Sequence, residues 1–480
     1  MKASQVVLFI AGVFALLGIG WLTFPADGID VGRLHLRFAS LEESMAEASE
    51  KKVDVDSVLT TIGNRFAMQR DTLDFYRQFF YENPDRIYLP DDDYTFFDGI
   101  FAQMENARRT GSTVRVAHYG DSQIEMDRIS AQLRQGLQER FGGRGTGMFP
   151  ARSNVPSASA TRSASGSFVQ YTMYGDSTTA RAWHNRYGVM AQVVQLNGGG
   201  TVSIHAAKQK SAQPLTKSFS SVSVLYGRAS STFTVKAWSD TLRPQPMTRT
   251  AEDGTAMATW YFPREVEKAT VSFTGSAEIY GISADGGYGI AVDNIPLRGC
   301  SGTIFSHINP DLMASSYNLD NTRLIILQFG GNYMPVIKST KNIERYMESI
   351  EEQIRYFQAA APGARILFIG PSDMGKSVGG RVTTWPLLPE LVDSLRSTVL
   401  RNDAAFWDLF HMMGGENSMV RWVKHSPSYA GPDYIHFTTA GAQVVGETLT
   451  RSFLTYYDFY TLRKTVPQQA VERYMKRGRN

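Results

Sequence analysis

The chain is poor in the residues that would indicate a disulfide-stapled or metal-holding protein. Its 480 residues include a single cysteine, Cys300, which excludes an internal disulfide framework and any cluster of thiolate ligands. The eight histidines show neither the His-Glu-x-x-His pattern nor a comparable ligand spacing. We therefore expect neither a metal nor another cofactor.

An excess of charge of one sign is also missing. The sequence has 49 Lys and Arg residues against 46 Asp and Glu residues, which leaves a net charge of +3. Proteins that follow a nucleic-acid backbone need a clear excess of cations on one surface, so nucleic acid is not an expected partner. The chain is long enough for two or three domains and at least one large core.

The N-terminus carries a long hydrophobic run. Residues 3–26 have no charge, and Val6–Phe24 is almost wholly apolar, which is about the length of a membrane-spanning helix. Trp21 near the outer end and Lys2 at the inner end fit an anchor whose N-terminus stays inside the cell. We expect residues 6–24 to anchor the protein in the inner membrane, with a cleaved signal peptide as the alternative. Both readings place the rest of the chain in the periplasm or elsewhere outside the cytoplasm.

Periodicity divides the rest of the chain into blocks. Between residues 151 and 278, short alternating runs separated by turn residues are typical of an antiparallel sandwich. On either side, strands alternate with helices, which indicates a mainly parallel sheet covered on both faces. The expected blocks are an anchor or signal segment (1–26), a helical spacer with a docking helix (27–110), the first part of an α/β domain (111–150), an inserted β-sandwich (151–278), the second part of the α/β domain (279–457) and a basic C-terminal tail (458–480).

The stretch from Val114 to Arg134 contains the candidate nucleophile. A buried strand leads into the turn Gly120-Asp121-Ser122, and apolar residues after the turn recur at roughly helical spacing. Open α/β sheets bind ligands at the carboxyl ends of their strands. The N–H groups of such a turn and the dipole of a following helix would favour a developing negative charge. Ser122 is therefore the candidate, although an ordinary turn or helix cap contains the same residues.

Three further turns of the same predicted sheet carry suitable groups. Gly299 would let a backbone N–H approach a substrate oxygen, and Asn332 offers an amide donor at a strand end. Asp433 and His436 precede the last helix, where the carboxylate can hold the imidazole while its other nitrogen faces a serine. Each group alone also fits a turn, a cap or a packed histidine. Their joint occurrence, in order along one sheet, is what indicates catalysis.

These residues resemble the four sequence blocks of the SGNH (GDSL-type) hydrolases. The blocks are Gly120-Asp121-Ser122, Gly299, Gly330-x-Asn332 and Asp433-x-x-His436. The resemblance covers Val114–Phe149 and about Ile279–Tyr457, and it implies a three-layer α/β fold around a parallel sheet. It also implies a catalytic triad of Ser122, His436 and Asp433. The implied oxyanion hole consists of the N–H groups of Ser122 and Gly299 and the amide of Asn332. Tyr333 stands where many members have aspartate.

The organisation is similar to that of the peptidoglycan O-acetylesterases of this family. These carry a sandwich resembling a carbohydrate-binding module between the first and second blocks, and the stretches His118–Gln123, Val292–Asn294 and Arg298–Gly302 are similar to theirs. The resemblance implies an esterase that removes acetyl groups from the muramic-acid C6 hydroxyl of O-acetylated cell-wall polysaccharide. Five aromatic residues of the insert are available to stack on sugars, although core packing also fits each: Trp183, Tyr187, Trp238, Trp260 and Tyr261.

Two other functions fit the same sequence. A glycan O-acetyltransferase would use the same triad, because it differs from an esterase in which acceptor reaches the acyl-enzyme. A non-catalytic envelope protein would bind glycan through the insert, but it would not need an intact triad. The exact glycan, the acyl group and the oligomeric state are left open by the sequence.

Overall fold

The structure is a computed structural model, and it describes residues 3–25, 27–32, 34–36, 71–152, 155–175, 179–209, 212–240, 245–248 and 254–476. The chain forms two compact units, Met1–Asp74 and Phe75–Asn480. Residues 37–70 of the expected helical spacer lie outside the described residues, as do residues 477–480 of the expected tail.

The first unit begins with helix α1 (Ala3–Thr23), followed by a small hairpin of β1 (Ile29–Val31) and β2 (Leu34–Leu36). Large apolar side chains of α1 are exposed, including Leu8 and Leu22. Taken over the described residues alone, no helix of the structure is long and apolar enough to cross a membrane. The anchor expected at residues 6–24 therefore stays a prediction.

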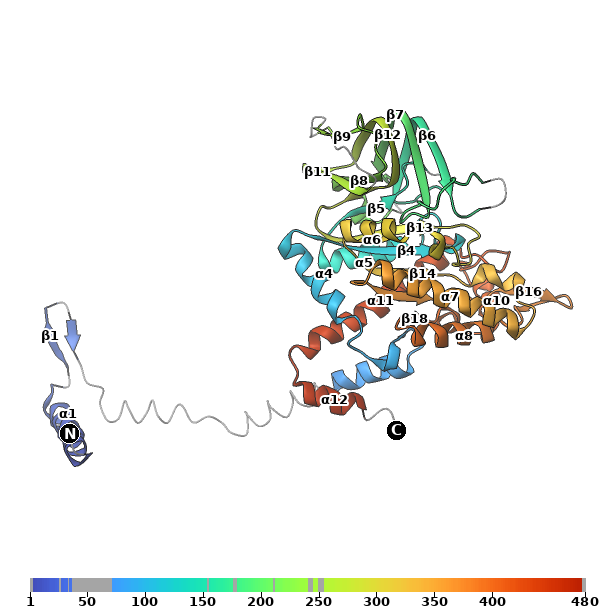
Figure 1. Cartoon of the computed structure of the whole chain (residues 1–480). Coiled ribbons are helices and arrows are strands. Elements are labelled where there is room, and N and C mark those ends of the chain that lie inside the picture. Colours follow the sequence, from blue (N-terminus) through green and yellow to red (C-terminus); the bar gives the residue numbers. More distant parts are fainter. Residues whose placement is uncertain are drawn as a thin grey trace. The chain divides into compact units, whose positions relative to one another are not determined.

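A six-stranded sheet forms the centre of the second unit (Figure 1), in the order β13-β4-β14-β15-β18-β3. The strands are β3 (Ile87–Tyr88), β4 (Thr113–Gly120), β13 (Gly289–Pro296), β14 (Thr322–Gln328), β15 (Arg365–Ile369) and β18 (Ala405–Trp407). All neighbours pair in parallel except the short edge strand β3, which is antiparallel to β18. The strands are buried on both faces, which is why their sequences are nearly continuous apolar runs. The predicted parallel sheet is confirmed.

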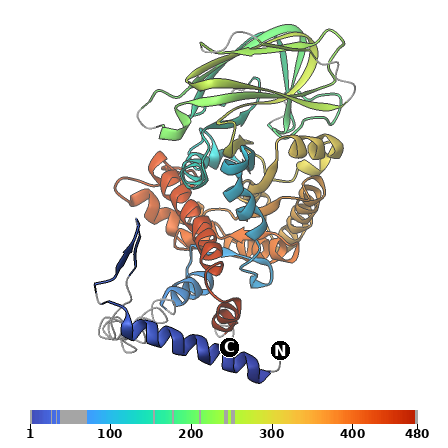
Figure 2. The same ribbon diagram turned by 90° about the vertical axis from the view of Figure 1, so that its left-hand side faces the viewer.

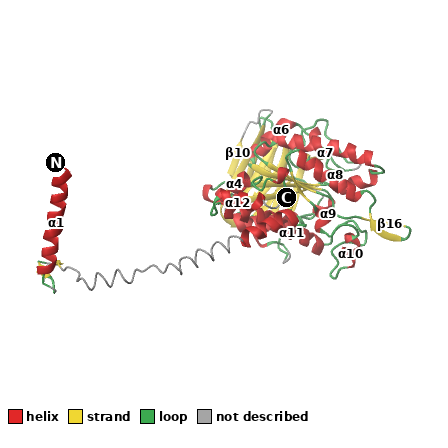
Figure 3. Ribbon diagram, turned by 90° about the horizontal axis from the view of Figure 1, so that it is seen from below, coloured by secondary structure: helices red, strands yellow, loops and turns green. Residues whose placement is uncertain are grey.

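Helices cover both faces of this sheet. One layer contains α4 (Asp98–Thr110), α5 (Ser130–Phe141) and α11 (Thr439–Arg463), and the other contains α6 (Pro310–Leu319), α7 (Thr340–Ala360) and α8 (Leu388–Arg401). Figure 3 shows the strands between the two layers. Helix α7 illustrates the cause, since its buried Ile343, Met347, Ile350, Ile354 and Phe357 recur at helical spacing on one face.

Smaller elements complete this body. The short helices are α9 (Leu409–Met412), α10 (Ser418–Lys424) and α12 (Gln468–Lys476). Residues 75–82 are helical and pack on α11 through aromatic pairs. The ring centroids of Tyr76 and Phe459 are 4.9 Å apart, and those of Phe80 and Tyr456 are 4.5 Å apart.

A second, eight-stranded sheet system lies on top of the α/β body, as Figure 2 shows. Its strands pair antiparallel and enclose their own apolar core, which includes Val202, Val222 and Phe273. The strands are β5 (Gly145–Phe149), β6 (Ala160–Thr172), β7 (Gln192–Ala206), β8 (Phe219–Gly227), β9 (Thr234–Trp238), β10 (Gln245–Thr248), β11 (Thr255–Val266) and β12 (Lys268–Asp285). We call residues 151–278 of this system the insert.

Strand β12 joins the insert to the α/β body without a break. Its first part pairs with β7 and β9, and its last four residues, Ile282–Asp285, pair with β5. The boundary predicted at residue 278 therefore falls inside a continuous strand. Among the described residues, strand β12 pairs only within the eight-stranded sheet, and β13 of the central sheet follows it after three residues.

The helix predicted directly after Ser122 begins later than expected. Ser122–Ile124 is a single 3₁₀ turn, and α5 starts at Ser130. Between them, Met126 and Asp127 adopt positive φ angles of 60° and 63°, which breaks any regular helix. The apolar residues that recur at that spacing are buried, but Ile124 and Ile129 precede α5 and only Leu133 and Leu137 belong to it. The helix dipole that we expected at the serine is not positioned there.

The docking helix predicted from about Asp92 also starts later. Pro90–Asp92 form a 3₁₀ turn in which Asp91 has a φ of 52°, and α4 begins at Asp98. The sequence pattern predicts an apolar face of Tyr94, Phe97, Ile100, Phe101 and Met104 for this helix. Of these five residues, Ile100, Phe101 and Met104 lie on the buried face of α4.

Candidate active site

Parallel register brings three of the predicted site residues to one edge of the central sheet. The last residues of β13 and β14, Pro296 and Gln328, both align with Gly120, the last residue of β4. Ser122, Gly299 and Asn332 follow these three strand ends within four residues. Neighbouring parallel strands that end level with one another must place their following loops together.

The structure joins the predicted nucleophile, base and carboxylate in one row. Ser122 Oγ lies 2.9 Å from His436 Nε2, and His436 Nδ1 lies 2.7 Å from Asp433 Oδ2. The other carboxylate oxygen accepts the backbone N–H groups of Ile435 and His436 at 3.0 and 3.1 Å. One oxygen therefore shapes the turn while the second orients the ring, which is the arrangement that activates a serine.

The charge on Asp433 follows from these contacts. Partial burial raises the pKa of its carboxyl group, but the hydrogen bonds from the His436 ring and from the N–H groups of Ile435 and His436 together bring it below the ordinary value. The carboxylate stays ionised at neutral pH and accepts the Nδ1 proton. We assign the tautomer of His436 on this basis, which leaves Nε2 to accept the Ser122 proton.

Gly299 and Asn332, two of the predicted oxyanion donors, differ in whether other groups already occupy the space or the bonds that a substrate oxygen would need. Gly299 has a φ of 74°, and the space beside its Cα is open for at least 4 Å. The glycine is thus required by the backbone conformation and leaves room for a substrate. The Asn332 amide nitrogen donates to Asp121 Oδ2 at 2.9 Å and to the Cys300 carbonyl at 3.2 Å. Asn332 can donate to an oxyanion only if the substrate oxygen replaces the weaker of these acceptors.

Asp121, next to the serine, positions this amide. Its buried carboxylate accepts the N–H of Gln123 at 2.9 Å as well as the Asn332 amide. Burial raises the pKa of Asp121 to about 6, although the Gln123 N–H, His436 and Asn332 act in the opposite direction. The group therefore titrates close to neutral pH. We had not given Asp121 a role from the sequence.

Two side chains that sequence reasoning missed tie the serine turn to the histidine turn. Gln123 donates to the Ile435 carbonyl at 2.7 Å and accepts the Phe437 N–H at 3.3 Å. Arg128 donates to the carbonyls of Ser122 and Phe437, both at 2.9 Å. Since the two turns are 314 positions apart in the chain, these bonds hold the triad in register. Arg128 gave no sequence signal, and Gln123 was noted only as part of the serine motif.

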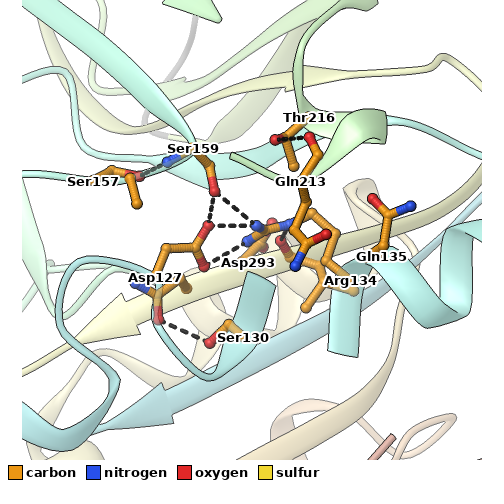
Figure 4. A network of polar contacts seen from close by, with 12 residues as sticks. Asp127, Ser130, Arg134, Gln135, Ser157, Ser159, Gln213, Thr216 and Asp293 are labelled. Atoms are coloured by element: carbon orange, nitrogen blue, oxygen red, sulfur yellow. Dashed lines mark hydrogen bonds and ion pairs between the residues drawn. The ribbon is translucent and has the colours of Figure 1, made fainter. Parts of the chain in front are cut away.

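Figure 4 shows a buried ion pair between Asp127 and Arg134. Asp127 belongs to the loop between Ser122 and α5, which we call the serine loop. Arg134 on α5 donates to the two Asp127 oxygens at 2.5 and 3.1 Å, and neither residue is more than 1% exposed. Arg134 also donates to the Val292 carbonyl of β13 at 2.8 Å, and Asp127 accepts the hydroxyl of Ser159. The pair therefore connects the serine loop, the central sheet and the start of the insert.

A second buried histidine lies behind the site and takes no part in the triad. The ring nitrogens of His118 contact the Gln328 amide at 3.1 Å and the Ser130 hydroxyl at 2.9 Å. Burial lowers the pKa of His118 to about 4, so the ring is neutral at physiological pH. Its role is to bind β4, β14 and α5 together. Among the described residues, no three or more His, Cys, Asp or Glu side chains are grouped to hold a metal ion.

A pocket of about 200 Å³ opens beside Ser122 and His436. Its wall is mostly apolar and includes Phe329, Pro335, Pro371, Met374, Trp385 and Leu409. The polar residues that line it are Asp121, Ser122, Gln123, Gln328, Asn332, Ser372 and His436. An apolar cavity with a few converging polar groups is the usual form of a small-molecule or substrate site.

The structure exposes two of the five aromatic residues considered for sugar stacking. Trp183 is 81% and Tyr261 65% exposed, whereas Tyr187 and Trp260 are each 4% exposed and belong to apolar cores. Trp238 is partly buried at the end of β9. Trp183 and Tyr261 can therefore contact a polymer without any rearrangement of the insert.

No family model matches the sequence, and no curated protein matches it. Among solved structures, a peptidoglycan O-acetylesterase is similar over 75% of this chain and 96% of its own, at 19% identity and a TM-score of 0.61. A family two carbohydrate esterase from Cellvibrio japonicus, at 9% identity, covers 62% of this chain and 99% of its own with a TM-score of 0.25. A protein described as a GDSL-like lipase from Parabacteroides merdae, at 15% identity, covers 35% and 74% with a TM-score of 0.28. At these identities the likeness concerns the fold, and the first structure carries it.

Proposed function

The chain has the fold of the SGNH-type esterases, and we propose that it is a serine esterase that removes O-acetyl groups from cell-wall glycan, with peptidoglycan as the substrate. The observation that carries this proposal is the row of Ser122, His436 and Asp433 at the edge of an open pocket. The choice of peptidoglycan is supported by the sequence resemblance and by the fold shared with a peptidoglycan O-acetylesterase.

The proposed reaction follows from the site geometry. Ser122 Oγ attacks the acetyl carbonyl carbon while His436 Nε2 takes the hydroxyl proton. The oxyanion is stabilised by the N–H groups of Ser122 and Gly299 and by the Asn332 amide, which exchanges its bond to the Cys300 carbonyl for the substrate oxygen. When the C–O bond breaks, His436 returns the proton to the glycan hydroxyl. A water molecule, deprotonated by His436, then attacks the acetyl-serine and releases acetate.

The test uses the full-length chain with two substrates. Wild-type protein should release acetate from O-acetylated peptidoglycan and hydrolyse an aryl acetate, and Ser122→Ala should do neither. If the acetyl group instead appears on added non-acetylated glycan while free acetate stays low, the protein is an O-acetyltransferase that uses the same triad. If neither substrate is turned over, the protein acts as a glycan-binding module and the esterase proposal is wrong.

We also propose that the catalytic unit works outside the cytoplasm, held by residues 6–24. The support is the uncharged, apolar sequence of that segment. N-terminal sequencing of the mature protein separates the two readings, because an uncleaved anchor begins at Met1 and a cleaved signal peptide leaves a new N-terminus after the apolar run. Activity that fractionates with cytoplasmic markers would contradict both.

A further inference from the structure

A hairpin that the sequence analysis did not single out stands beside the candidate active site. Strands β16 (Gly375–Val378) and β17 (Arg381–Thr384) pair antiparallel, and Figure 1 shows the hairpin projecting from the α/β body. Its base is fixed by two bonds of 2.8 Å, from the Trp385 N–H to the Met374 carbonyl and from the Gly375 N–H to the Tyr434 carbonyl. The second bond connects the hairpin to the turn that carries Asp433 and His436.

The hairpin register places both of its cations on one face. Lys376 pairs with Thr383, and Val378 pairs with Arg381, so these four side chains point to the same side. Lys376 and Arg381 are diagonal neighbours, about 7–8 Å apart at the backbone, which lets two long side chains reach one anion. The Lys376 ammonium lies 4.7 Å from the centroid of the Trp385 ring. The ring is therefore next to the face of the hairpin that carries the two cations.

The two cations of this face have no carboxylate partner among the described residues. The segment from Met374 to Trp385 contains Lys376 and Arg381 and no acidic residue. Within the described part of the chain, neither cation forms an ion pair with a carboxylate; Arg381 is exposed and Lys376 half-buried. Cations without partners beside a substrate pocket are available to an incoming anion.

The pocket is larger than the reaction needs. Its volume of about 200 Å³ compares with about 15 Å³ for one water molecule on the same measure, so an acetyl group of three heavy atoms fills a small part. The remainder can take part of the sugar that carries the ester. Trp385 lines the pocket, and an aromatic ring at this place can lie against the apolar face of a sugar.

We propose that Trp385 and the hairpin β16–β17 form a subsite for an acidic glycan, in which a sugar packs on the Trp385 ring while a carboxylate of that sugar or of its peptide substituent binds Lys376 and Arg381. This inference rests on the proposed esterase function and narrows its substrate to acidic glycans. It predicts that neutral acetylated polymers, such as xylan, are poorer substrates than polymers with a carboxylate near the ester.

The experiment compares Lys376→Gln/Arg381→Gln with wild type in the full-length chain. On O-acetylated peptidoglycan, kcat/KM should fall about 5- to 10-fold, as expected for two partly solvated ionic contacts. On an aryl acetate and on acetylated xylan, kcat/KM should change less than about twofold, because these substrates lack the carboxylate. The wild-type rate on peptidoglycan should also fall as NaCl is raised, because salt screens exposed charges, and the double variant should lose most of this dependence.

The matched control is Lys341→Gln/Arg345→Gln, which removes two exposed cations from α7 and should leave all three activities unchanged. An equal loss on xylan and peptidoglycan, an equal loss in the control, or no loss on any substrate would overturn the subsite. A wild type that prefers xylan would overturn it as well and leave the esterase proposal intact.

Binding separates failure of the subsite from failure of the proposed function. Ser122→Ala and the triple variant that adds the two hairpin substitutions are sedimented with insoluble peptidoglycan, which requires no turnover. Weaker retention of the triple variant supports the subsite even if no ester is cleaved. Equal retention contradicts it, whatever the activity.

Discussion

The central sheet and the insert place their polar residues in opposite ways. In the parallel central sheet, charges inside the strands are buried and paired, as in Arg115, which donates to Asp285 and Asp293 at 2.7 and 2.5 Å. The polar groups of the candidate active site, such as Ser122 and Asn332, lie beyond the ends of the strands. In the antiparallel insert, strands such as β6 turn one face to solvent, and its candidate ligand contacts are scattered surface aromatics.

This difference explains where chemistry can arise. Parallel strands that end level with one another bring several loops to one place, whereas antiparallel strands send their loops to both ends of the sheet. The central sheet can therefore assemble a serine, a histidine and two donors from remote segments. The insert can add binding surface, and its polar cluster at Glu278 is an ion-pair network with His184 and Arg228, which contains no serine nucleophile. Four predictions test this division, from the largest expected effect to the smallest.

Removing the candidate nucleophile should abolish the activity proposed for the edge of the central sheet and leave the insert unchanged. Ser122→Ala or His436→Ala should lower kcat on an aryl acetate by about 10³-fold or more, with an unchanged unfolding midpoint. Tyr261→Ala in the insert serves as the control and should retain full aryl acetate turnover. Full activity of Ser122→Ala would remove the serine from the mechanism.

Breaking the Asp127–Arg134 ion pair should destabilise the contact between the central sheet and the insert. Arg134→Met leaves a buried carboxylate without its partner, which should cost about 3–5 kcal/mol of unfolding free energy. The double variant Asp127→Asn/Arg134→Met should regain part of this loss, since no unpaired charge remains. The measurement is urea unfolding of each variant. A loss below about 1 kcal/mol would show that the pair does not support the serine loop.

Asp121→Asn should lower kcat and should raise the free energy of unfolding at pH values above the pKa of Asp121. Because burial raises the pKa of Asp121 from 3.8 to about 6, ionisation disfavours the folded state, and wild-type stability falls as pH rises from about 4 through 6. The variant lacks this titration, so at pH 8 it should be more stable by up to about 3 kcal/mol, with no difference below pH 4. Its kcat should fall, because the Asn332 amide loses its carboxylate acceptor. Glu348→Gln, at an exposed site on α7, should show neither effect.

Removing exposed aromatics from the insert should change polymer binding alone. Trp183→Ala/Tyr261→Ala should raise KM on O-acetylated peptidoglycan a few-fold, as loss of one or two stacking contacts does, without changing aryl acetate kinetics. Tyr434→Ala near the catalytic turn offers the contrast, since it should affect both substrates. An unchanged KM on polymer would mean that the insert does not hold glycan through these rings.

Much of the site was predictable because each key residue occupies a turn with its own local signal. Ser122, Gly299, Asn332, Asp433 and His436 each follow a strand or open a helix, and the register of β4, β13 and β14 then brings the first three together. Their roles in catalysis stay predictions until activity is measured.

What could not be predicted depends on contacts between remote segments. Arg128 links two turns by bonds to backbone carbonyls, which any residue type supplies, so no pattern marks it. The late start of α5 follows from left-handed backbone at Met126 and Asp127, stabilised by the remote Ser159 and by Arg134. The hairpin β16–β17 was missed because its strands are short and lack an apolar alternation.

The continuity of β12 across the boundary of the insert has a mechanical consequence. A binding module on a flexible linker gains from proximity only by effective concentration, which falls as the linker lengthens. Here β12 is followed by β13 after only three residues, and Arg115 of β4 binds Asp285 at the end of β12, so a polymer held by the insert would lie at a set distance from Ser122.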